Sequence, residues 1–141
     1  PVLFRSICSD TLKAVLPGKP SPERIKGALL SWYRKEARRI ISERLSLCAD
    51  AAKKIGITAG KDFSLRRMKR RWGSCSSKGE IQFTPFLIGT SEICIDYVII
   101  HELCHRKEPN HGQNFYRLLE KALPDWRERK KELMSRIVPY F

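Results

Sequence analysis

Hydrophobic residues between positions 25 and 55 recur at spacings of mostly three and four residues. They are Ile25, Leu29, Trp32, Ala37, Ile40, Leu45, Cys48, Ala52 and Ile55. This period places them on one face of a helix, so it predicts one long amphipathic helix. Ser21 can cap the free amides of the first turn, and Pro22 fits the first helical position. The helix is expected to begin there and to end at Gly56.

Helical periodicity is lost in the next segment, ITAGKDFSLRRMKRRWGSCSSKGEIQFTPFL, which several glycines interrupt. We predict two strands, at about 63–72 and 80–84, joined as a hairpin by the SCSSKG turn. Residues 1–20 are predicted to be a lead-in, and 21–141 to be one domain. Because the chain begins with proline rather than methionine, the lead-in is expected to be the remnant of a longer N-terminal region.

Three more helices are predicted after the sheet. Thr90 or Ser91 caps the first of them, which ends before Pro109. The other two run from about Gly112 to Pro124 and from Asp125 to about Arg136. The order of elements predicts an α+β fold with a long N-terminal helix, a small β-sheet or hairpin, a central helix and two C-terminal helices.

Composition and charge narrow the choice of partners. Hydrophobic residues make up 42% of the chain and charged residues 30%, which is typical of a globular protein. The formal charge of +13 favours an acidic partner, such as nucleic acid, an anionic membrane surface or a polyanionic substrate. No apolar run approaches the ~20 residues of a membrane span. Five irregularly spaced cysteines argue against a disulfide framework, so we expect a cytoplasmic protein.

All three histidines of the chain fall within the stretch HELCHRKEPNH. His101 and His105 are four residues apart, so a helix places both side chains on one face, where they can bind one zinc ion. Glu102 lies beside such a metal without binding it, which suits the general base for a zinc-bound water. Catalytic zinc usually has three protein ligands, and His111 is the leading third.

The spacing from His101 to His111 matches the metzincin pattern H-E-x-x-H-x-x-G-x-x-H. In place of its glycine the chain has Glu108 followed by Pro109, and this proline can end the helix and turn the chain back. One zinc ion per chain is therefore expected.

Other interpretations of these residues stay open. Histidines of a buried helix are often hydrogen-bonded core residues, although a structural zinc site would more often include cysteines. Cys104 lies on the other side of the helix from the histidines and is expected in the core. Cys75 is a candidate nucleophile, but the zinc site already uses every imidazole that could activate its thiol.

The runs RRMKRRWGSCSSKGEI, IDYVIIHELCH, NHGQNF and LPDW resemble the YgjP-like zinc metallopeptidases, a zincin group related to SprT-type proteins. The resemblance covers about residues 22–136. It implies a minimal zincin fold in which His101, His105 and His111 hold zinc and Glu102 is the catalytic base. Members often have an asparagine where this chain has Thr84, and they usually carry more sequence before the first helix.

The function expected from these observations is hydrolysis of peptide bonds by a zinc-bound water that Glu102 activates, with a protein or peptide as substrate. Candidate contacts to the transition state or substrate are Tyr97, Tyr116 and Arg71. Asp96 or Glu108 is a candidate to orient a ligand histidine. The substrate is expected to add as a strand to an edge at Ile81–Thr84 or 66–72.

The alternative function is a basic nucleic-acid-binding domain in which zinc only stabilises the fold. The run RRMKRR has five positive charges in six positions. Together with the basic face of the long helix (Arg34, Lys35, Arg38 and Arg39), it could bind phosphates. The candidate nucleic-acid contacts are Arg66, Arg67, Lys69 and Arg70. SprT-related proteins act on proteins attached to DNA, so this expectation rests partly on analogy. Membrane binding is not expected, and no oligomeric state is predicted.

Overall fold

The computed structural model describes residues 3–8 and 11–141, with side chains from residue 16 onward. The elements run in the order β1 (Leu3–Cys8), β2 (Thr11–Val15), α1 (Pro22–Leu47), α2 (Ala49–Lys54), β3 (Ser64–Leu65), β4 (Gly73–Cys75), β5 (Ile81–Phe83), the 3-10 helix η1 (Pro85–Gly89), α3 (Glu92–Cys104), α4 (Gln113–Ala122) and α5 (Trp126–Met134). None of the helices described is long and apolar enough to cross a bilayer.

The long helix begins where the sequence predicts. The Ser21 hydroxyl accepts a hydrogen bond from the Arg24 amide at 3.3 Å, and Pro22 occupies the first turn. The predicted single helix is divided at Cys48 into α1 and α2, so the prediction of one continuous helix is wrong. Gly56 follows α2 with a φ of 72°, a left-handed conformation that glycine adopts without steric cost. The predicted end of the helical region is confirmed.

Three short strands form a sheet in the order β3-β5-β4. The predicted hairpin exists, but its strands are β4 and β5, with Ser76 and Gly79 closing the turn between them. The prediction of a continuous strand over 63–72 is wrong. β3 pairs in parallel with one side of β5, and β4 pairs antiparallel with the other side. The chain from 66 to 72 must therefore cross from one edge of the sheet to the other, and it forms a loop.

This strand order also corrects the expected substrate edge. β5 has a neighbour on each side, so Ile81–Thr84 has no free edge to offer. Thr84 itself is fully buried and caps η1, its hydroxyl accepting from the Phe86 amide at 3.4 Å. The free edge nearest α3 belongs to β4.

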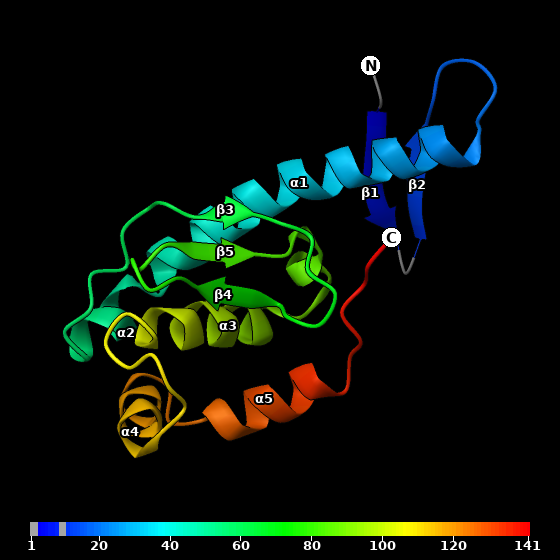
Figure 1. Cartoon of the computed structure of the whole chain (residues 1–141). Coiled ribbons are helices and arrows are strands. Elements are labelled where there is room, and N and C mark those ends of the chain that lie inside the picture. The colour runs from blue at the N-terminus through cyan, green and yellow to red at the C-terminus, as the bar shows by residue number, and fades with distance from the viewer. Residues whose placement is uncertain (1–2, 9–10) are drawn as a thin grey trace.

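Helix α3 is the centre of the fold. It lies between the sheet on one side and α4 and α5 on the other, with α1 also packed against it (Figure 1). Burial all around is typical of a core helix, and it accounts for the four apolar residues at 97–100, directly before His101. Its buried residues are Cys94, Ile95, Tyr97, Val98, Ile99, Ile100, Glu102, Leu103 and Cys104. The predicted core position of Cys104 is confirmed.

The two C-terminal helices lie close to their predicted bounds. α4 starts one residue after Gly112, and α5 is slightly shorter than the predicted 125–136. The chain after α5 then returns to the loop 66–72, where the Arg67 guanidinium donates to the Phe141 carbonyl at 2.6 Å. The Phe141 ring packs on Phe86 with centroids 4.9 Å apart.

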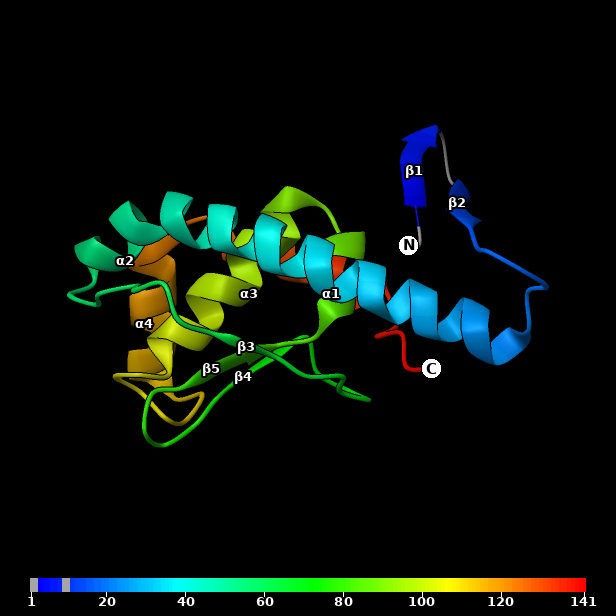
Figure 2. The same cartoon turned by 90° about the horizontal axis from the view of Figure 1, so that it is seen from above.

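The lead-in contains an antiparallel hairpin, β1 with β2, that the sequence pattern does not predict. It lies beside the N-terminal half of α1 and away from the three-stranded sheet (Figure 1, Figure 2). The domain boundary predicted at residue 20 stays a prediction.

Candidate active site

The structure brings the three histidines together. Helix α3 presents His101 and its C-cap His105 on one face, and the loop that follows returns His111 to the same place. The Nε2 atoms of His101 and His111 lie 3.0 Å apart, and one nitrogen from each of the three rings lies within 4.8 Å of the others. Three imidazole nitrogens thus face one point in space.

The loop itself orients His105. Its Nδ1 lies 3.0 Å from the backbone carbonyl oxygen of Glu108. Because a carbonyl can only accept, Nδ1 carries the proton, and Nε2 is left with a free lone pair. Glu108, one of the two residues predicted to orient a ligand histidine, makes this contact through its backbone carbonyl rather than its side chain.

The other predicted orienting residue, Asp96, lies elsewhere, and that prediction was wrong. Its carboxylate forms a two-bond pair with the Arg44 guanidinium at 2.6 and 2.8 Å. Asp96 lies near the N-terminal end of α3, and the pair ties this helix to α1.

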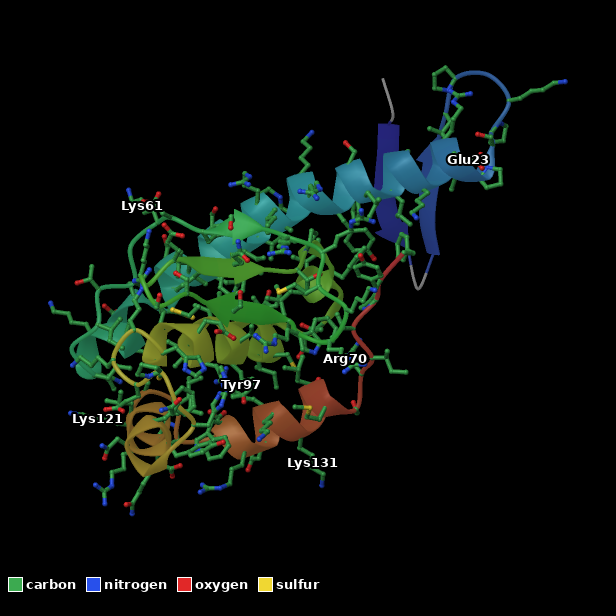
Figure 3. The ribbon with its side chains drawn as sticks, viewed as in Figure 1. Glu23, Lys61, Arg70, Tyr97, Lys121 and Lys131 are labelled. Atoms are coloured by element: carbon green, nitrogen blue, oxygen red, sulfur yellow. The ribbon has the colours of Figure 1, made fainter. Side chains whose placement is uncertain are left out.

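Tyr97 contacts the first histidine from one helical turn earlier. Its hydroxyl oxygen lies 3.3 Å from Nδ1 of His101. The side chain is buried between α3 and α5 (Figure 3). Burial raises the pKa of the Tyr97 phenol to about 12, so it stays protonated at neutral pH. Because the Tyr97 hydroxyl contacts Nδ1, it lies on the opposite side of the His101 ring from Nε2, the nitrogen that faces the other two histidines.

An aromatic side chain forms the floor of the cluster. Phe115, fully buried on α4, has its ring centroid 4.9, 4.6 and 4.9 Å from those of His101, His105 and His111. Phe115 lies in the helix predicted from about Gly112 to Pro124, but it is not among the predicted site residues. No local spacing rule places it there, because His111 lies in the loop before α4, so the packing of α4 against α3 brings the ring to the histidines.

The surroundings of His101 and His111 favour the neutral form of these two imidazoles. Burial, together with the neighbouring His105 and His111, lowers the pKa of His101 to about 3. Burial also lowers the pKa of His111. Because a metal binds the neutral imidazole, these shifts favour the state that can bind one.

Glu102 is buried beside the histidines, with 6% of its surface exposed. Burial raises the pKa of its carboxyl group to about 7, and the positive charge of Arg71 opposes the shift. Gly73 of β4 packs directly on it, because a Cβ atom at this glycine would lie 3.0 Å from Cγ of Glu102. The edge strand therefore touches the residue predicted to be the base.

A cavity of about 460 Å³ opens over the cluster. It is lined by Arg70, Arg71, Trp72, Gly73, Ser74, Cys75, Tyr97, Val98, His101, Glu102, His105, Pro109, His111, Leu133 and Met134. The edge strand, the loop before it and the end of α5 thus form its walls around the histidines.

Two other predicted candidates can now be located. Tyr116 does not line this cavity: it stacks on Trp126, with centroids 5.2 Å apart, in a separate groove on α4 and α5. Cys75 does line the cavity, but burial raises the pKa of its thiol. A thiol with a raised pKa is a poor nucleophile at neutral pH, which argues against cysteine catalysis.

The model of a protein family matches almost the whole chain. The YgjP-like metallopeptidase domain covers residues 5–136. The chain belongs to this family. Among solved structures, the YgjP-like chain is similar to "Crystal structure of the metallopeptidase zymogen of Pyrococcus abyssi abylysin", with 25% identity and a TM-score of 0.56 over 67% of this chain and 92% of that one. No curated protein matches it.

These comparisons agree with the geometry of the site. The YgjP-like chain is a metallopeptidase with an α+β, minimal zincin-like fold. Its family implies a metal cofactor and a protein or peptide substrate, and the three histidines form a group that could hold the metal.

Proposed function

We propose that this metallopeptidase binds one zinc ion through Nε2 of His101, His105 and His111. The convergence of the three rings carries this proposal. Tetrahedral zinc with Zn–N distances of ~2.0–2.1 Å has ligand nitrogens about 3.3 Å apart. The 3.0 Å between Nε2 of His101 and of His111 is close to this spacing. Three histidines leave one position of a tetrahedron open, as in catalytic zinc sites.

Glu102 is proposed as the general base. When bound, zinc would act as a Lewis acid that polarises the scissile carbonyl and acidifies water. The Glu102 carboxylate accepts the proton of the attacking water and passes it to the leaving amine. In the metal-free protein burial raises the pKa of this carboxyl group to about 7, which supports a role in proton transfer.

Tyr97 is proposed to orient His101 rather than to contact the transition state. The hydroxyl lies at Nδ1, and a hydrogen bond there holds the ring with Nε2 toward the cluster. Arg71 lines the cavity with its side chain exposed, which supports the expected contact with substrate.

The substrate is proposed to add as an extended strand to the free edge of β4. The Ser76 amide bonds to the Glu80 carbonyl, and the Trp72 carbonyl accepts from the Thr84 amide. In an antiparallel ladder alternate residues face the partner strand, so the backbone groups of Gly73 and Cys75 point away from β5. They lie along the cavity wall, where a peptide could pair with them.

Two measurements test the proposed function. Metal analysis of protein purified without added metal should find about one zinc per chain, and His101→Ala should remove almost all of it. Glu102→Gln should keep the zinc and the fold but lose hydrolysis of a casein or peptide-library substrate. Glu128→Gln, on the exposed side of α5, is the matched control and should keep full activity. Turnover that persists in Glu102→Gln would contradict the assigned base.

A second candidate function is nucleic-acid association through α1. A shallow groove is lined by Arg34, Lys35, Arg38, Arg39, Ser42 and Leu65. It shares no residue with the catalytic cavity, so the two functions can coexist. Of the loop residues predicted to contact nucleic acid, Arg66, Lys69 and Arg70 are exposed. Arg67 instead binds the C-terminal residue.

Salt dependence separates this candidate from the peptidase. Binding through phosphates weakens steeply with salt, by counterion release. The Arg34→Gln/Arg38→Gln variant should reduce retention on duplex DNA at low salt while keeping peptidase activity. Retention unchanged by several hundred millimolar salt, or absent at low salt, would argue against the α1 groove as a nucleic-acid site.

The cytoplasmic location stays a prediction. Cys48, Cys75, Cys94 and Cys104, the cysteines whose side chains the structure describes, are free thiols, which supports a reducing compartment.

A further inference from the structure

Positively charged side chains outnumber negatively charged ones in the lining of the catalytic cavity. Apart from the histidines, its charged lining residues are Arg70, Arg71 and Glu102. The two arginines are exposed, whereas Glu102 is buried and is assigned to the chemistry. A substrate entering this cavity therefore meets positive charge.

The two arginines of the wall are available for a ligand. Among the residues with described side chains, neither Arg70 nor Arg71 takes part in an ion pair or side-chain hydrogen bond that the structure shows, and the only electrostatic partner of Arg71 shown there is Glu102. Arg106, by contrast, donates to the backbone carbonyls of Thr58 and Gly79. An unpaired guanidinium beside a cavity can form two parallel hydrogen bonds with a carboxylate.

The backbone that carries these arginines is held at both ends. On one side, Arg67 donates to the Phe141 carbonyl, and the Lys69 ammonium lies 5.4 Å from the ring centroid of Tyr140. Arg70 lies near this C-terminal segment (Figure 3). On the other side, the Trp72 carbonyl accepts from the Thr84 amide at 3.0 Å, directly after Arg71. A positioned guanidinium loses less entropy on binding a carboxylate than a freely moving one.

We propose that the cavity selects peptides with an acidic side chain close to the scissile bond, which Arg71 binds with support from Arg70. This inference rests on the proposed peptidase function and names its substrate class. The acidic residue lies on the side of the scissile bond nearest the N-terminal end of β4, because both arginines precede that strand. A basic residue at the same position is disfavoured, because it meets like charge.

Binding to a form that cannot turn over tests the proposal. Zinc-loaded Glu102→Gln is titrated with fluorescent peptides that differ only by Asp against Asn, with the acidic residue moved one position at a time. At one position we expect the Asp peptide to bind about tenfold tighter by anisotropy, the equivalent of ~1.4 kcal/mol. Adding Arg71→Gln should abolish the difference, and Arg71→Lys should restore part of it, because lysine keeps the charge but not the paired geometry.

The control removes one positive charge elsewhere. Lys131→Gln, on the side of α5 that faces away from α3, should keep the preference for Asp (Figure 3). Equal affinity for Asp and Asn peptides at every position would overturn the proposal, as would a loss of preference as large in Lys131→Gln as in Arg71→Gln. Tighter binding of a DNA oligonucleotide than of any peptide, lost in Arg71→Gln, would assign the arginines to phosphate instead.

Hydrolysis by the unaltered protein distinguishes a failure of the specificity proposal from a failure of the proposed peptidase function. If it cuts Asp and Asn peptides at equal rates, the inference on specificity is wrong and the peptidase function stands. If it neither cuts nor binds any peptide while carrying zinc, both are wrong.

Discussion

Replacing Gly73 by alanine tests the contact between the edge strand and Glu102. An added Cβ would lie 3.0 Å from Cγ of Glu102, 3.1 Å from Cγ1 of Val98 and 3.2 Å from Cδ1 of Phe83. Carbon atoms in ordinary contact are about 3.5–4.0 Å apart, so each neighbour must move by several tenths of an ångström. All three neighbours are buried, which leaves them little room.

Gly73→Ala is expected to lower both the free energy of unfolding and the rate of hydrolysis. Overpacking of a core typically costs ~1–3 kcal/mol, and three close contacts at one site suggest about 2 kcal/mol. With a urea m-value of ~2 kcal/mol/M, the midpoint of unfolding should fall by about 1 M. Because a misplacement of ~1 Å can cost a hundredfold in rate, displacing Glu102 by about half of that should slow hydrolysis roughly tenfold.

Urea melts of the zinc-loaded protein and initial rates on one peptide measure these two effects. Gly89→Ala is the control, because a Cβ at Gly89 meets no atom within 4 Å. It should leave the midpoint and the rate close to those of the parent. An unchanged midpoint and rate in Gly73→Ala would refute the steric argument. Equal losses in Gly73→Ala and Gly89→Ala would show that the loss comes from replacing a glycine in general, and not from the close contacts at Gly73.

Three further predictions follow from individual contacts. Tyr97→Phe should weaken zinc binding about tenfold in chelator competition, because His101 loses its hydrogen-bond partner; unchanged affinity would contradict the orienting role. Arg44→Ala should lower the free energy of unfolding by about 2 kcal/mol, because it leaves the half-buried Asp96 unpaired; a loss under ~0.5 kcal/mol in denaturant melts would count against this pair. In the metal-free protein, burial raises the pKa of Glu102 from 4.5 to about 7, so its ionised form destabilises the fold increasingly from pH 4.5 to 7. Metal-free Glu102→Gln should thus be ~2–3 kcal/mol more stable at pH 8, with no gain at pH 4, and equal gains at both pH values would refute this cause.

Local patterns determined much of the site. The four-residue spacing of His101 and His105 needs only a helix to bring the rings together, and the apolar run before them ensures that this helix is buried. The boundaries at Ser21 and Gly56 are likewise local, since a cap and a left-handed residue act on neighbouring backbone groups.

Contacts between distant segments decided the rest. The charges of RRMKRR do not reveal that this segment crosses over the sheet, because that depends on β3 and β4 pairing with opposite sides of β5. The same pairing makes β4 the free edge and puts Gly73 against Glu102. Asp96 pairs with Arg44, 52 positions earlier in the chain, instead of lying near a histidine. Tyr116 lies outside the cavity because of how α4 packs. Periodicity reports which face of an element is buried, whereas strand order and helix packing determine which residues meet across that face.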